Sequence, residues 1–335
     1  MRKTKYPNML FSPPSADFEF ISYLDPMQRR HFLKGSMVAG AAGLFANPLL
    51  AGESASSKPL PAEKPFNLDY AFHDGMFRHH AGADFLEQIK FGHSMGFRSI
   101  EDNGMRGRTP EQQKKIGETL AKLGMTMGVF VAHDIDWQKP SLSTGKAEIR
   151  EKFLSQVKES VEVAKRCGAK YMVAVPGIIT PGLDTSYQKA YVLETLRRAT
   201  DILAPHNLVL TLETLNFRDH PNQLLPDPAT IYAMIKGVNS PACKMQFDIY
   251  HVQIHCGNII PNLDLSWDEI GYLQIGDNPG RKEPTTGEIN YKNVFKHIYN
   301  KGFKGILGME HGISGQGKEG EVALLKAYRE SDSFR

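Results

Sequence analysis

The hydrophobic positions of this chain form short, nearly continuous apolar runs that alternate with longer amphipathic segments. The pattern is clearest in the second half, where runs end at residues 213, 248, 274 and 310. Their spacing of roughly 25 to 35 residues is the length of one strand plus one crossover helix, which predicts successive parallel strands. Because the runs are continuous rather than alternating, the strands are expected to be covered on both faces.

The same alternation predicts eight strand–helix units over residues 66–330. The expected strands cover residues 67–72, 97–101, 125–132, 171–175, 208–213, 243–248, 270–274 and 305–310. Strict strand-then-helix order, repeated eight times, favours a closed α/β barrel, a (β/α)8 TIM barrel, over an open doubly wound sheet.

Helix signals between these strands support the assignment. Helices are expected over residues 84–95, 187–203 and 319–328, and from Thr109, where a Thr cap is followed by Pro and then by Gln at the third position. The helix after the third strand carries an apolar stripe at 149, 153, 157, 161 and 164, which should face the sheet. Asp227 and Asn290 are expected to cap two later helices.

Composition fits one soluble domain of this type. The chain has 335 residues, of which 41% are hydrophobic and 10% aromatic, and a barrel of eight units needs about 250 residues. The net charge of +3 lacks the basic excess typical of nucleic-acid binders, so no nucleic-acid partner is expected. Cys167, Cys243 and Cys256 are odd in number and show no CxxC spacing, which argues against a disulfide framework.

Residues 27–51 have the parts of an export signal. Arg29 and Arg30 precede an uncharged stretch rich in Gly and Ala that ends at Ala51. The paired arginines resemble the twin-arginine class, which exports folded proteins, so the Tat export machinery is a predicted partner and the periplasm the predicted location. The apolar stretch is too short to span a bilayer, so no stable membrane association is expected. Met27 is the expected start, which would make residues 1–26 a mis-assigned extension, and residues 52–65 have the composition of a flexible linker.

Four oxygen-bearing side chains close the last four predicted strands, namely Glu213, Asp248, Gln274 and Glu310. One acidic residue after a strand is usually a helix cap or a solvated loop group, but four in succession favour a site at the mouth of the barrel. Carboxylates so close raise one another's pKa unless a cation lies between them. Because all four side chains offer oxygen, we expect a divalent metal of the hard class, Mg²⁺ or Mn²⁺.

Further polar residues follow the predicted strands and are candidate substrate-binding groups. His251 lies three residues beyond Asp248, and Arg281 follows the seventh strand, where it could bind an anionic or hydroxylated substrate. Glu101 ends the second strand and His133 the third. For each of them a structural or solvated role is the alternative interpretation.

Several segments resemble the hydroxypyruvate isomerase family within the xylose-isomerase-like barrels. They are Leu212-Glu-Thr-Leu-Asn216, Met245-Gln-Phe-Asp-Ile-Tyr-His251, Gly271-Tyr-Leu-Gln-Ile-Gly276, Pro279 to Tyr291, and Gly308-Met-Glu310. The resemblance spans about residues 66–330 and implies that the four oxygen-bearing residues are the metal ligands. It also implies that Glu213 and Glu310 are the paired acid/base groups. The related ketose 3-epimerases usually have His at the third ligand, so Gln274 favours the isomerase branch.

The resemblance predicts an enzyme that moves a proton between neighbouring carbons through an enediolate, as in the conversion of hydroxypyruvate to tartronate semialdehyde. Two alternatives stay open: a periplasmic 3-epimerase of ketoses or sugar derivatives, and a non-catalytic solute-binding barrel. The expected partner is in each case a small molecule, a sugar or a hydroxy-keto acid. The true substrate stays open, and a homo-oligomer is compatible with the sequence.

Overall fold

The structure is a computed structural model that describes residues 60–335. The predicted N-terminal extension (1–26), the predicted export signal (27–51) and residues 52–59 of the predicted linker lie outside the described residues.

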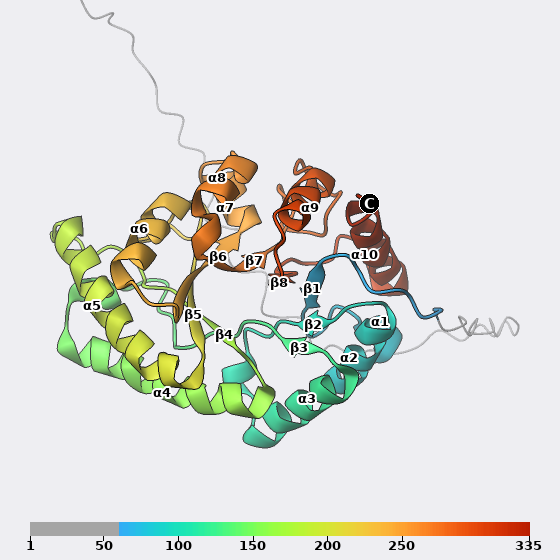
Figure 1. Ribbon diagram of the computed structural model, residues 1–335, viewed down its shortest axis with the longest axis horizontal. Coiled ribbons are helices and arrows are strands. Elements are labelled where there is room, and N and C mark those ends of the chain that lie inside the picture. The colour runs from blue at the N-terminus through green and yellow to red at the C-terminus, as the bar shows by residue number, and fades with distance from the viewer. Residues whose placement is uncertain (1–59) are drawn as a thin grey trace, which may run out of the picture. The chain divides into compact units, whose positions relative to one another are not determined.

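Eight parallel strands form one sheet in the order β3-β2-β1-β8-β7-β6-β5-β4 (Figure 1). They are β1 (Asp69–Phe72), β2 (Ser99–Ile100), β3 (Thr126–Met127), β4 (Tyr171–Ala174), β5 (Val209–Glu213), β6 (Cys243–Asp248), β7 (Ile270–Gln274) and β8 (Ile306–Gly308). The chain just beyond β3 pairs in parallel with β4 through Val131 and Val173. Backbone hydrogen bonds from Val173 to Phe130 and from Ala132 to Val173, 2.8 and 2.9 Å long, join the two edges. The sheet therefore closes, and the predicted (β/α)8 barrel is confirmed.

Helices follow the strands and cover the outside of the sheet (Figure 1). They are α1 (Arg78–Ala81), α2 (Phe85–Ser94), α3 (Pro110–Leu123), α4 (Ala147–Cys167), α5 (Thr185–Leu203), α6 (Pro228–Val238), α7 (Ile249–His255), α8 (Ile259–Ser266), α9 (Tyr291–Asn300) and α10 (Gly317–Ser331). Short 3-10 turns are η1 (Met105–Gly107), η2 (Leu142–Thr144), η3 (Ala204–His206) and η4 (Trp267–Glu269).

The predicted caps are present. Thr109 and Gln112 form a reciprocal capping box at α3, Asp227 accepts a hydrogen bond from the Thr230 amide at α6, and Asn290 caps α9. These contacts satisfy amide groups that the first helical turn leaves without partners. Of the stripe on α4, the positions at 153, 157, 161 and 164 are buried.

Two regions differ from the expected elements. β2 and β3 are shorter than predicted, although the pairing continues past them, because the Gly128 amide donates to the Ile100 carbonyl at 2.7 Å and the Asp102 amide to Val129 at 3.3 Å. The connection between β6 and β7 holds two short helices, α7 and α8, where the repeating pattern required one helix but the sequence indicated no bounds for it. Asn258 separates them with a left-handed backbone (φ 51°), a conformation that asparagine tolerates better than most residues.

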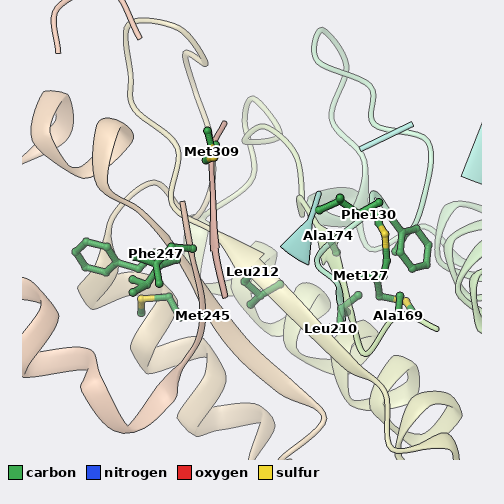
Figure 2. Packing of buried hydrophobic residues seen from close by; sticks show 14 of the residues in the cluster. Met127, Phe130, Ala169, Ala174, Leu210, Leu212, Met245, Phe247 and Met309 are labelled. Carbon is green, nitrogen blue, oxygen red and sulfur yellow. The ribbon is translucent and has the colours of Figure 1, made fainter. Parts of the chain in front are cut away.

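Side chains alternate between two cores because successive strand residues point to opposite faces. The outer core, between sheet and helices, includes Leu210, Leu212, Met245 and Phe247 (Figure 2). The barrel interior is built around an apolar cluster of Ala71, Val129, Val173, Tyr272 and Ile306.

The upper part of the barrel interior is polar. Glu101 and Gln246 are fully buried there. A Cβ atom at Gly308 would collide with the carboxylate of Glu101, and one at Gly128 would collide with the hydroxyl of Tyr272. These two glycines therefore leave the volume that the polar groups fill.

A close approach between α3 and α4 gives a test of this packing. A Cβ atom at Gly117 would lie 2.9 Å from Cα of Cys167 and nearer still to the Arg166 carbonyl. Gly117→Ala should therefore destabilise the protein by about 1–3 kcal/mol, measured by urea unfolding. Gly107→Ala is the control, because a Cβ there meets no described atom within 4 Å. Equal stability of the two variants would contradict this account of the packing.

Candidate active site

The four oxygen-bearing side chains lie at one end of the barrel. Glu213, Asp248 and Gln274 are the last residues of β5, β6 and β7, and Glu310 follows β8 by two positions. Asp248 is the register partner of Gln274, and Gln274 that of Gly308, so these strands end at a common level. The structure thus brings the four residues to the carboxyl-terminal mouth, where barrel enzymes hold their reactive groups.

Arg281 lies between two of the carboxylates. One nitrogen, Nη2, donates to Asp248 Oδ2 at 2.8 Å and to Glu310 Oε2 at 2.7 Å. Burial lowers the pKa of Arg281, but the charges of Glu310 and Asp248 outweigh it, so the net pKa is raised. A positive nitrogen therefore occupies the position between the acids at which a cation was expected.

The two glutamates have raised pKa values. Burial is the main cause for Glu213, and the charges of Glu310 and Asp248 raise its pKa further, to well above the ordinary range. Burial also raises the pKa of Glu310, to about 7, although Arg281 opposes the shift. Glu310 can therefore hold or release a proton near neutral pH, which is the property that acid/base catalysis needs. Glu213 keeps its proton to a higher pH than an exposed glutamate does.

His251 faces the same mouth with a defined tautomer. Its Nδ1 lies 2.6 Å from Asn216 Nδ2 and 3.3 Å from the Asn216 amide. The Asn216 side chain cannot be reversed, because its Oδ1 accepts from the amides of Arg218 and Asp219. Nδ1 is therefore the acceptor, and Nε2 carries the proton.

The His251 Nε2 atom is buried and has no hydrogen-bond partner among the described residues. It lies 3.6 Å from Asp248 Oδ2 and 3.8 Å from Glu213 Oε1, and burial lowers the pKa of the ring to about 4. A neutral ring with its N–H aimed into the mouth can donate to a ligand oxygen. One atom each of Glu213, Asp248 and His251 lie within 4.8 Å of one another, but a protonated nitrogen cannot ligate a metal. The four oxygen-bearing residues are thus better candidate metal ligands than a group that includes His251.

Gln274 is oriented by groups deeper in the barrel. Its amide nitrogen donates to Glu101 Oε1 at 2.7 Å, and its oxygen accepts from Gln246 at 2.8 Å. Tyr272 donates to the other Glu101 oxygen at 2.7 Å. The Gln274 oxygen keeps one further lone pair for a ligand. Glu101 is thus held by protein donors, and its predicted contact with substrate stays a prediction.

His133 is buried and interacts with the backbone through both ring nitrogens. Nε2 accepts from the Val175 amide at 3.2 Å, and Nδ1 lies 2.9 Å from the Asp134 carbonyl. Burial lowers the pKa of His133 to about 4, so the ring is neutral at pH 7. Its predicted role in substrate binding also stays a prediction.

Sequence reasoning missed the residues that orient this site. Gln246 had a usable signal, because it is a polar residue at an inward position of an apolar run. Asn216 and Tyr272 had no such signal, since their partners, His251 and Glu101, lie 35 and 171 positions away along the chain. Such contacts depend on the register of the closed barrel.

Comparison with known proteins identifies the family. A family model described as "Xylose isomerase-like TIM barrel" matches residues 89–330, and the chain belongs to this family. A model of the twin-arginine translocation signal matches residues 26–46, which confirms the predicted class of export signal. Among the described residues, no helix has the length and apolar character needed to cross a membrane.

Curated relatives narrow the class of enzyme. The chain is 34% identical to hydroxypyruvate isomerase of Escherichia coli over 68% of its own length and 88% of that protein. It is 29% identical to 2-oxo-tetronate isomerase of Cupriavidus necator, over 70% and 89% of the two chains. The protein is therefore an isomerase of this family.

A solved structure agrees with the fold. The E. coli 3-keto-D-glucoside 4-epimerase superposes with a TM-score of 0.66 over 78% of this chain and 99% of that chain, at 17% identity.

The raised pKa values make a prediction about the metal-free protein. A carboxyl with a raised pKa binds its proton more tightly in the folded than in the unfolded protein. Its contribution to stability is fully present below the unfolded pKa of about 4.5, and it is lost as the pH rises through the folded pKa. Glu213→Gln should therefore raise the melting temperature of chelator-treated protein at pH 8, by a few degrees, and raise it less at pH 5. Glu118→Gln, on the exposed face of α3, is the control. A difference that does not change with pH would contradict the inferred burial of charge.

Proposed function

We propose that this protein is a divalent-metal-dependent isomerase of small α-hydroxy carbonyl compounds, acting by proton transfer through an enediolate. The observation that supports this most is the placement of Glu213 and Glu310 at one barrel mouth, both with raised pKa values. Two such carboxyls at one mouth can serve as base and acid on neighbouring carbons of one substrate.

The residues at the mouth fit a cation such as Mg²⁺ or Mn²⁺. Glu213, Asp248, Gln274 and Glu310 would hold it through oxygen, the ligand type that these ions prefer. Arg281 Nη2 already places positive charge between Asp248 and Glu310, so the site tolerates a cation there. When bound, the metal supplies Lewis acidity that polarises a substrate carbonyl.

The chain's own groups carry out the remaining steps. One of the two glutamates takes a proton from the hydroxyl-bearing carbon next to the carbonyl, and the other returns a proton to the former carbonyl carbon. The hydroxyl proton passes to the former carbonyl oxygen, so the hydroxyl and the carbonyl exchange places. His251 donates its Nε2 hydrogen to a substrate oxygen and so holds the reacting atoms in register. Arg281 pairs with an anionic or hydroxyl oxygen of the substrate once its contacts with Asp248 and Glu310 are exchanged.

The named relatives suggest the substrate class. Hydroxypyruvate isomerase and 2-oxo-tetronate isomerase act, by their names, on short hydroxy-keto acids, and we propose a substrate of this chemistry. The twin-arginine signal supports a periplasmic location. It also suggests how a weakly bound ion is acquired, because a protein that folds before export can take up Mg²⁺ or Mn²⁺ before it meets competing copper or zinc.

Substitution of either glutamate tests the mechanism. Glu213→Gln and Glu310→Gln should each lower kcat by about 10²–10⁴-fold while the far-ultraviolet circular dichroism spectrum stays that of the wild type. Glu283→Gln is the matched control, because this buried carboxylate binds the Ser314 amide on a neighbouring loop. Near-normal turnover in both site variants would rule out paired acid/base catalysis.

Metal removal separates the proposal from a non-catalytic solute-binding barrel. Chelation should abolish turnover and Mn²⁺ or Mg²⁺ should restore it, with solvent deuterium appearing at the reacting carbon of the product in D₂O. A 3-epimerase would also exchange that hydrogen, but it would return a ketose with its carbonyl in place. Ligand binding that survives chelation without any deuterium incorporation would instead identify a solute-binding protein.

A further inference from the structure

A cavity of about 630 Å³ opens beside the candidate active site. It lies between the loop after β1 and the loop after β8, and its lining includes His73, Arg78, His311, Gly312 and Gln316. Cavities of roughly 300–1,000 Å³ usually enclose ligands much larger than a three-carbon acid. The space is therefore larger than the shortest substrate of this class requires.

Two contacts and one position in the sequence connect the cavity to the catalytic groups. His73 lines the cavity, and its Nε2 lies 3.2 Å from Glu101 Oε1, the atom that orients Gln274. His311 directly follows Glu310. The amide of Gly312 donates to the Arg281 carbonyl at 3.0 Å. A substrate whose reacting end lies among the carboxylates thus has this cavity within reach of its other end.

The acidic groups of the cavity already have partners. Asp74 accepts from Arg108 at 2.9 Å and from Gln88 at 3.2 Å. Glu321 on α10 is buried and accepts from the amides of His79 and His80, at 2.7 and 3.0 Å. Both carboxylates are therefore hydrogen-bonded to neighbouring parts of the cavity wall.

Two basic side chains near the cavity, in contrast, are free to bind a ligand. Within residues 60–335, Arg78 and Lys282 have no ion-pair or side-chain hydrogen-bond partner. Arg78 lines the cavity, and Lys282 Nζ lies over Gly312. The N-terminus of α10, whose cap residue Gln316 makes no side-chain hydrogen bond, adds partial positive charge to the same wall.

We propose that this cavity binds the distal oxyanion of a substrate longer than three carbons, with Arg78 as its main ligand. The inference rests on the proposed function and narrows its substrate class to sugar acids or sugar phosphates whose reacting hydroxy-carbonyl end lies at the carboxylates. A guanidinium can hold either a carboxylate or a phosphate through two parallel hydrogen bonds.

Binding of unreactive probes tests the subsite without turnover. Calorimetry on the metal-loaded protein would compare gluconate, sorbitol 6-phosphate and sorbitol, which share a six-carbon polyol chain and differ at one end. The charged probes should bind about tenfold or more tightly than sorbitol, and the tighter of the two identifies the oxyanion. Arg78→Ala should remove this advantage and Arg78→Lys should keep part of it. An acid held only by the metal would bind Arg78→Ala as well as wild type, and that result would overturn the proposal.

Kinetics then distinguish this inference from the proposed function. Fructuronate, fructose 6-phosphate, fructose and hydroxypyruvate would be assayed for proton exchange in D₂O. A rise in KM of tenfold or more for the charged six-carbon substrates in Arg78→Ala, with a smaller change for fructose, supports the subsite. If hydroxypyruvate is turned over but wild type and Arg78→Ala bind the charged probes equally, the subsite is overturned and the proposed function stands. Absence of exchange with every substrate would overturn the proposed function, and the binding comparison would still decide the subsite.

Discussion

Crowding of negative charge at one end of a closed barrel is the constraint on which the rest of this site depends. Glu213, Asp248 and Glu310 converge there, and taking carboxylates out of water is costly unless positive charge or hydrogen bonds compensate. The structure shows both forms of compensation. Arg281 contacts two of the acids, and the raised pKa values of Glu213 and Glu310 mean that protonation relieves part of the remaining repulsion.

The same constraint explains why polar groups continue below the mouth. Gln274 has to present its oxygen rather than its nitrogen upward, and the Glu101 carboxylate beneath it accepts the amide hydrogen. Glu101 is itself buried and receives the Tyr272 hydroxyl. Gln246 then links Gln274 to Thr211 of β5 through hydrogen bonds of 2.8 and 2.9 Å. A chain of hydrogen bonds from Glu101 to Thr211 thus crosses the barrel interior beneath the mouth.

Much of this architecture was predictable from the sequence, because hydrophobic periodicity and caps are local signals. The apolar runs that end at Glu213, Asp248 and Gln274 correspond to β5, β6 and β7 with their ends at the predicted residues. Local signals do not encode contacts across the barrel. The tautomer of His251 depends on Asn216, 35 positions earlier, and the contact of Arg281 with Glu310 depends on how the loop after β7 folds back. The bounds of the short helices α7 and α8 were not predicted, since segments of seven and eight residues carry too little periodicity to separate from a loop.

The two glycines of the barrel interior have a consequence for how this fold can diverge. The Glu101 carboxylate occupies the space that a side chain at position 308 would need. Gly128 likewise leaves room for the Tyr272 hydroxyl, which donates to the same carboxylate. Replacing the acid by a small apolar residue would leave a void beside Gly308. Enlarging Gly308 first would displace the acid, and enlarging Gly128 first would displace the Tyr272 hydroxyl that binds it. These positions are therefore expected to change together or not at all, so a lineage that abandons the buried acid must cross an intermediate that packs worse than both its ancestor and its descendant.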